Sequence, residues 1–174
     1  PAPGPVQFDM PSNETMNEAG GSVAEAPLLP NIVPIEPDRK ALKVPLQALS
    51  SARKPILLAG LGVFWDKASA ELVALAERLG APVLTTSKCK GAIPEDHPLR
   101  AGCVIGGIIE RELVMQSDLI VTVGLDAVEL QPKPWPYTIP VISLSNTPSL
   151  EAMIPAQSEM VGNLKGILAG LAEF

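Results

Sequence analysis

The stretch LGAPVLTTSKCKGAIPEDHPLRAG at residues 79–102 predicts a buried strand that leaves a helix and enters a long, structured loop. A second stretch, KPILLAGLGV at residues 54–63, predicts another short buried strand that ends in the glycine turn 60–62. Short aliphatic runs bounded by glycines are typical of parallel strands that helices cover on both faces. Together the two stretches indicate an α/β fold.

The same alternation of strand and helix continues along the chain. It predicts a doubly wound, mostly parallel sheet of about five or six strands with right-handed crossovers and helices on both faces. The expected strands are 56–59, 82–86, 119–124, 140–144 and a short one near 160–161. The expected helices run from Asp38, from Asp66, over 108–116 and over 163–172.

Four residues are expected to set the ends of these helices. Asp38 and Asp66 precede leucines at helical spacing, so each is expected to be an N-cap. Pro45 must kink the first helix or shift its start, because proline lacks an N–H group. Gly80 is expected to end the helix that precedes the second strand.

Composition excludes several classes of protein. The chain has 174 residues, 47% of them hydrophobic and 18% charged, which suits one ordinary domain with a full core. The net charge of −6 opposes binding to a nucleic-acid backbone. No apolar run approaches the roughly 20 residues that cross a bilayer, and the first residues show neither the basic nor the apolar region of an export signal. We therefore expect a cytoplasmic protein with no nucleic-acid and no membrane partner.

Residues 1–37 differ from the rest of the chain. They are rich in proline, glycine and acidic residues and show no sustained period, which is typical of a linker. Within them, residues 5–11 could form a short strand closed off by prolines, but no partner strand lies nearby in the sequence. The predicted organisation is a linker at 1–37 and one α/β domain at 38–174.

The glycine turn at 60–62 supports two interpretations. Glycines between a strand and a helix let the backbone approach a pyrophosphate, as in dinucleotide-binding folds. Here the third glycine of that fingerprint is replaced by Trp65, and residues 85–87 are Thr-Thr-Ser without an acidic residue for a ribose. A tight structural turn is therefore favoured over nucleotide binding. A ligand, if bound, would lie at the carboxyl ends of the strands, near Gly60, Gly62, Thr86, Ser87, Gly124 and Leu125.

The remaining polar residues predict no catalytic group and no metal site. Cys89 would need a base to act as a nucleophile, but the only histidine, His97, lies in a polar turn. The two cysteines and this histidine do not match a zinc pattern, so free thiols are expected. The segment 110–112, Glu-Arg-Glu, is expected to be the exposed edge of a helix, and Gly106-Gly107 before it is a second possible anion site.

Four ordered stretches of the chain resemble one protein family. They cover RKPILLAGLG, LGAPVLTT, KGAIPEDHP and SDLIVTVG, at residues 53–62, 79–86, 90–98 and 117–124. Together they resemble the central domain of thiamine-diphosphate-dependent enzymes, of the acetolactate synthase-like type. That resemblance implies a Rossmann-like domain of an enzyme that acts on 2-oxo acids by decarboxylation and carbon-carbon bond formation, as a transferase or lyase.

The resemblance also implies partners and cofactors outside this sequence. Residues 4–11 resemble the closing strand of the pyrimidine-binding domain, so 1–37 are expected to be a remnant of that domain and a linker. In this family the pyrimidine-binding and diphosphate-binding domains of the parent chain hold thiamine diphosphate and magnesium. Neither motif is present here, so the chain alone is expected to be inactive and not to bind thiamine diphosphate. The parent enzyme is expected to be a homo-oligomer.

The sequence departs from the flavin-binding members of the family at two places. After Val123-Gly124 those members continue with an arginine and paired aspartates, whereas residues 125–130 here are LDAVEL. The aspartate expected after the fourth strand is also replaced, within 143–146. Bound FAD or adenine nucleotide is therefore not expected, and a scaffold role is favoured. The alternatives are a stand-alone FAD-, ADP- or NAD-binding module and an assembly module with an unusually apolar exposed patch.

Overall fold

The computed structural model describes residues 7–18, 20–21, 40–130, 135–148 and 154–173. The chain divides into two compact units, 1–33 and 34–174. In the first unit, residues 12–16 form turns, and the amide of Glu14 donates to the carbonyl of Pro11. The strand expected at residues 5–11 is not formed over 7–11, whereas residues 5 and 6 lie outside the described residues.

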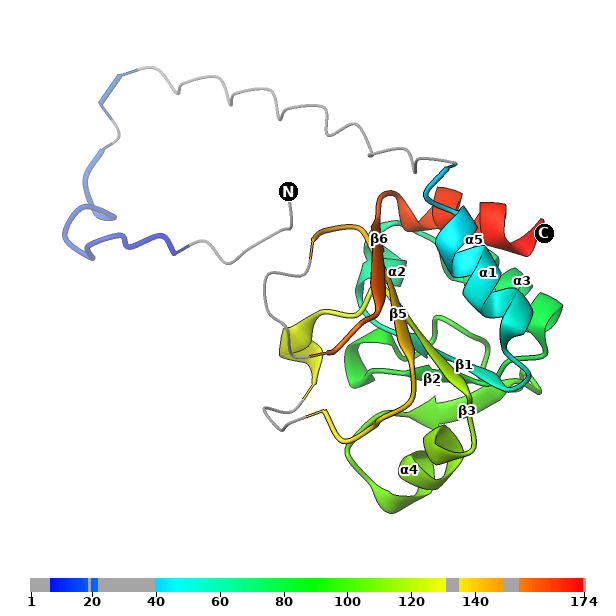
Figure 1. The fold of residues 1–174 in the computed structure, drawn as a ribbon. Coiled ribbons are helices and arrows are strands. Elements are labelled where there is room, and N and C mark those ends of the chain that lie inside the picture. The colour runs from blue at the N-terminus through cyan, green and yellow to red at the C-terminus, as the bar shows by residue number, and fades with distance from the viewer. Residues whose placement is uncertain (1–6, 19, 22–39, 131–134, 149–153, 174) are drawn as a thin grey trace. The chain divides into compact units, whose positions relative to one another are not determined.

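The second unit is built on a six-stranded parallel sheet, which confirms the predicted fold class (Figure 1). Its strand order is β3-β2-β1-β4-β5-β6, and every neighbouring pair is parallel. The order reverses between β1 and β4, the position where doubly wound sheets place their ligand crevice. The strands are β1 (Pro55–Ala59), β2 (Val83–Thr85), β3 (Arg100–Cys103), β4 (Leu119–Val123), β5 (Val141–Ser145) and β6 (Ser158–Val161).

The predicted strands at 56–59, 82–86, 119–124, 140–144 and 160–161 correspond to β1, β2, β4, β5 and β6. The edge strand β3 was not predicted, because residues 100–103 were assigned to the loop. They read Arg-Ala-Gly-Cys, and all four are only half-buried, so the aliphatic signal of a buried strand is missing. The register with β2 also shifts between Val83 and Leu84, which marks this edge as irregular.

Helices cover the two faces of the sheet unequally. They are α1 (Lys43–Ser51), α2 (Gly62–Trp65), α3 (Ser69–Leu79), α4 (Ile108–Met115) and α5 (Leu164–Ala172), with short 3-10 turns η1 (Ser87–Cys89) and η2 (Ala127–Glu129). Figure 1 shows α1, α3 and α5 grouped on one side and α4 on the other. No helix among the described residues is both long and apolar enough to cross a membrane.

Alternation along the strands divides the core into two apolar clusters. Leu57 of β1 and Val121 of β4 belong to the larger cluster, which also contains residues of α1, α3 and α5. Ile56 and Ile120, their neighbours in the sequence, belong to the smaller cluster, which contains Val114 of α4. Because successive strand residues point to opposite faces, each strand is anchored on both sides.

At the helix ends, the structure confirms the expected effect of Pro45 on the start of the first helix and corrects the role expected for Asp66. Helix α1 begins at Lys43, so Pro45 lies in its first turn, where a missing N–H group costs nothing. The cap expected at residue 38 lies outside the described residues. Asp66 does not cap α3 as expected, because that helix begins at Ser69, after Ala68.

Instead, Asp66, which follows α2, accepts a hydrogen bond from the start of α5 and so holds these two helices together. One carboxylate oxygen of Asp66 accepts a hydrogen bond from the amide of Leu164 at 2.7 Å, and the other accepts from Nδ2 of Asn146 at 3.2 Å. Asn163 is the N-cap of α5 and accepts from the amide of Gly166 at 3.1 Å. The N-terminus of α5 is therefore satisfied by two side chains, one of them from a distant segment.

We predict that Asp66→Ala lowers the free energy of unfolding by about 1–2 kcal/mol, because it leaves the amide of Leu164 without its charged partner. Urea unfolding followed by circular dichroism measures this loss. Asp96→Ala, the same change at an exposed turn position, serves as the matched control and is expected to stay within about 0.5 kcal/mol of the parent. Equal effects of the two substitutions would refute the role given to Asp66.

Candidate functional site

The crevice at the carboxyl ends of β1 and β4 brings four predicted site residues together. The amide of Gly60 donates to the carbonyl of Val123 at 2.8 Å, and that of Gly62 donates to the carbonyl of Gly124 at 2.9 Å. The turn after β1 thus lies directly against the turn after β4, where Leu125 follows. The predicted residues Gly60, Gly62, Gly124 and Leu125 form one packed contact.

This close approach explains why glycines stand at these positions. A Cβ atom on Gly60 would lie 2.5 Å from Cα of Leu125 and 2.6 Å from the carbonyl oxygen of Gly124. A Cβ atom on Gly62 would lie 2.8 Å from Cα of Gly124. These distances are too short for any side chain, so the two glycines are required by backbone packing, the structural interpretation favoured from the sequence.

The other two predicted residues, Thr86 and Ser87, differ in burial: Thr86 is buried and Ser87 is exposed. Thr86 is 1% exposed; its amide donates to the carbonyl of Ala59 at 2.9 Å, and its Oγ1 accepts from the amide of Cys89 at 3.2 Å. Thr86 therefore joins β1 to β2 and caps η1. Ser87, the first residue of η1, is exposed.

Glu129 was not among the residues expected at the strand ends, yet its carboxylate lies between the turns that follow β1, β2 and β4. Its two oxygens lie 2.9 and 3.0 Å from the amide nitrogen of Leu61, which donates to them. Oγ1 of Thr86 donates to one oxygen at 2.5 Å, and the amide of Asp126 donates to the other at 3.0 Å. A single carboxylate thus receives donors from the turns after β1, β2 and β4.

Glu129 gives the crevice a negative charge at the place where a dinucleotide fold would receive a phosphate. A Cβ atom on Gly60 would lie 2.6 Å from Oε1 of Glu129, so the carboxylate also fills the space beside this turn. A phosphate at this place would compete for the same amide and would meet a like charge. The arrangement favours a crevice used for packing.

The cysteines and the histidine form no nucleophile and base pair. Burial, with a smaller contribution from the Glu129 carboxylate and then from Cys103, raises the pKa of Cys89 to about 12. Its thiol stays protonated at neutral pH, and the thiolate is the reactive form. His97 contacts other groups: its Nε2 lies 3.3 Å from Oε1 of Glu77, and its Nδ1 accepts from the amide of Leu99 at 3.2 Å. The turn role expected for His97 is confirmed.

Glu110 requires a correction. It was expected on the exposed edge of a helix, but it is 7% exposed and accepts hydrogen bonds from the amides of Ile105 and Gly106. The helix turns its side chain back toward the preceding loop, where it caps backbone donors. Because this carboxylate already engages Gly106, the second anion site considered at Gly106-Gly107 is not supported. Glu112 is exposed, as expected.

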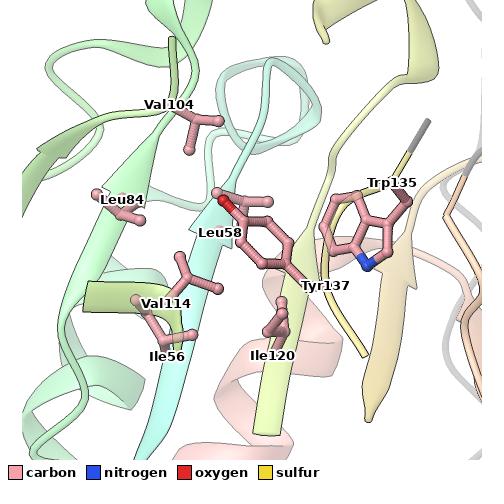
Figure 2. A pocket seen from close by; sticks show the side chains of 8 residues that line it. All are labelled: Ile56, Leu58, Leu84, Val104, Val114, Ile120, Trp135 and Tyr137. Atoms are coloured by element: carbon pink, nitrogen blue, oxygen red, sulfur yellow. The ribbon is translucent and has the colours of Figure 1, made fainter. Parts of the chain in front are cut away.

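A small cavity lies on the face of the sheet that α4 covers. Its volume is about 20 Å³, room for roughly one water molecule, and Figure 2 shows the eight side chains that line it. The rings of Trp135 and Tyr137 meet edge to face with centroids 5.1 Å apart. Burial, and next the Glu110 carboxylate, raises the pKa of Tyr137. The lining residues are Ile56, Leu58, Leu84, Val104, Val114, Ile120, Trp135 and Tyr137.

This lining suits side-chain packing better than binding. Six of its eight side chains are aliphatic, and an apolar space of this size stays dry. Nε1 of Trp135 is buried without a hydrogen-bond partner. Among the described residues, no group of three or more histidine, cysteine or acidic side chains is placed to hold a metal ion. The crevice around Glu129 remains the candidate site.

Comparison with known proteins identifies one family. The sequence model described as "Thiamine pyrophosphate enzyme, central domain" matches residues 42–171. A protein of Methanococcus aeolicus described as a probable acetolactate synthase large subunit is 33% identical over 70% of this chain and 21% of its own length. Sulfoacetaldehyde acetyltransferase of Rhodobacter capsulatus is 37% identical over 64% of this chain and 20% of its own length.

Solved structures agree with these sequence matches. A Mycobacterium smegmatis protein described as thiamin diphosphate-dependent superposes with a TM-score of 0.69 at 29% identity, over 80% of this chain and 28% of that one. Benzoylformate decarboxylase from Polynucleobacter necessarius shares the fold, with a TM-score of 0.71 at 24% identity, over 88% of this chain and 30% of that one. The chain thus spans about a fifth of the length of the curated relatives it matches.

We predict that Glu129→Ala lowers the free energy of unfolding by about 1–3 kcal/mol, because the amide of Leu61 and the hydroxyl of Thr86 lose their common acceptor. Glu129→Gln keeps one acceptor oxygen and is expected to cost less. Urea unfolding measures both effects.

Glu112→Ala, on the exposed side of α4, is the matched control for Glu129→Ala and is expected to change stability by less than about 0.5 kcal/mol. A loss at Glu129 no larger than at Glu112 would show that the crevice carboxylate does not hold the three turns together.

Proposed function

Because this chain belongs to the thiamine pyrophosphate enzymes, whose central domain matches residues 42–171, we propose that it is the scaffold between the catalytic domains of such an enzyme. Residues 38–174 are the central domain, and residues 1–37 are a linker with the remnant of a preceding pyrimidine-binding domain. A diphosphate-binding domain follows in the same polypeptide. The parent is a cytoplasmic homo-oligomer, as its family resemblance implies.

The parent enzyme acts on 2-oxo acids by decarboxylation and carbon-carbon bond formation, as a transferase or lyase. Thiamine diphosphate supplies that chemistry when bound, and magnesium anchors its diphosphate. The residues described here do not fit this group. The crevice at the strand ends already contains the Glu129 carboxylate, which would repel a diphosphate, and its glycine turns pack on each other. The flanking domains therefore hold the cofactor.

The observation that carries the scaffold role is the Glu129 carboxylate in the crevice between β1 and β4. It disfavours the alternative of a stand-alone FAD-, ADP- or NAD-binding module, which would need this crevice for its phosphates. The names of the relatives add support. They include a probable acetolactate synthase, an acetyltransferase and a probable 2-ketoarginine decarboxylase, whose matches cover 70%, 64% and 52% of this chain. A domain shared by such different reactions suits support better than chemistry.

We predict that the full-length protein releases carbon dioxide from pyruvate or a related 2-oxo acid only when thiamine diphosphate and magnesium are both present. Removing either by dialysis with a chelator should abolish turnover, and adding both back should restore it. Residues 1–174 alone should show neither turnover nor a thermal shift with the two cofactors. Cofactor-independent turnover of the full-length protein, or a thermal shift of residues 1–174, would contradict the proposal.

A further inference from the structure

The ring of His97 contacts two different segments near the start of the edge strand β3. Its Nδ1 accepts a hydrogen bond from the amide of Leu99 at 3.2 Å, and its Nε2 lies 3.3 Å from Oε1 of Glu77 on α3. The side chain of His97 is 12% exposed, whereas that of Glu77 is 62% exposed. The ring is therefore largely buried between α3 and the loop that leads into β3, with one partner on each nitrogen.

These two contacts determine which nitrogen of the ring carries the proton. A backbone amide can only donate, so Nδ1 is the unprotonated, accepting nitrogen of a neutral ring. Nε2 then carries the proton, and the Glu77 carboxylate is placed to accept it. A doubly protonated ring has a donor on both nitrogens and offers no acceptor to the amide of Leu99. Protonation of His97 therefore removes this hydrogen bond, whichever way the ring is turned.

The carboxylate of Glu77 can balance the charge of a protonated ring, because it already contacts Nε2. In the loop, the carboxylate of Glu95 lies 2.8 Å from the guanidinium of Arg100 and 3.9 Å from Nζ of Lys90. Asp96 directly precedes the histidine. These two acids and two bases balance each other, so Glu77 sets the sign of the charge that the ring meets. Protonation thus exchanges a hydrogen bond to the loop for an ion pair with α3.

The hydrogen bond that is lost lies where the chain enters β3. The carbonyl of Leu99 accepts from the amide of Val83 at 2.8 Å, and the amide of Arg100 donates to the carbonyl of His97 at 3.0 Å. All four residues of β3 are only half-buried, and its register with β2 shifts between Val83 and Leu84. By contrast, β1 and β4 are buried at every position. Loss of a contact at this entry therefore loosens β3 before it affects the centre of the sheet.

We propose that His97 makes the start of β3 sensitive to pH: the neutral ring holds the amide of Leu99, and the protonated ring releases it and pairs with Glu77. The element with two states is the segment 97–103, and the proton at Nδ1 selects between them. Histidine side chains change their charge between about pH 5 and 8, so mild acidification releases this segment. The device uses only residues of this domain and does not rest on the proposed function.

Hydrogen–deuterium exchange of the full-length protein, measured by mass spectrometry between about pH 8 and about pH 5, tests the proposal. Each measured rate is compared with the rate of the unfolded chain at the same pH, because the intrinsic rate of exchange also depends on pH. We expect the protection of peptides within residues 97–103 to fall by about tenfold or more on acidification. Peptides within β4 are the internal control and are expected to keep their protection, because all five residues of that strand are buried.

His97→Asn is the matched variant. The side-chain oxygen of asparagine can accept a hydrogen bond from the amide two residues further on, and asparagine does not titrate. We therefore expect residues 97–103 of this variant to keep their protection at both ends of the pH range. Equal losses in the parent protein and in His97→Asn would overturn the proposal.

The parent protein also decides the matter without any variant, so the test remains valid if His97→Asn does not fold. Unchanged protection of residues 97–103 on acidification would refute the role given to His97. An equal loss in β4 would refute it too, because that pattern is general unfolding. Neither readout involves thiamine diphosphate, so either failure leaves the proposed function standing.

Discussion

The carboxylate of Glu129 is the contact on which the carboxyl edge of this sheet depends. It accepts hydrogen bonds from Leu61 after β1, Thr86 after β2 and Asp126 after β4. Each of these strands ends in a turn whose amides or hydroxyl would otherwise need water or a ligand. The contact is possible because a glycine at position 60 leaves room for the carboxylate.

Because of this contact, the carboxyl ends of the strands contribute to the packing of the domain. In doubly wound sheets the point where strand order reverses is the usual ligand site. Here the order reverses between β1 and β4, but the turns pack on each other and the chain's own acid takes the position open to a phosphate. The two turns and the Glu129 carboxylate therefore fill the carboxyl ends of β1 and β4 with packed groups.

Much of the fold could be predicted from the sequence, because buried parallel strands consist of short aliphatic runs that here are bounded by glycines. Strand β1 and its turn at 60–62 are an example. The edge strand β3 could not be predicted in this way, since its residues, Arg-Ala-Gly-Cys, are half-buried and form no aliphatic run. Asp66 was read as a local cap, but its partner, Leu164, lies far along the chain. Glu129 was missed for the same reason, because its donors at Leu61 and Thr86 are remote in sequence.

The most direct test of the account is a crystal structure of the full-length protein grown with excess FAD. We expect the Glu129 carboxylate to accept hydrogen bonds from the amide of Leu61 and the hydroxyl of Thr86, with no flavin or adenine density between β1 and β4. Density for the nucleotide in that crevice, with Glu129 displaced from Leu61, would contradict the central claim that this domain uses its crevice for packing.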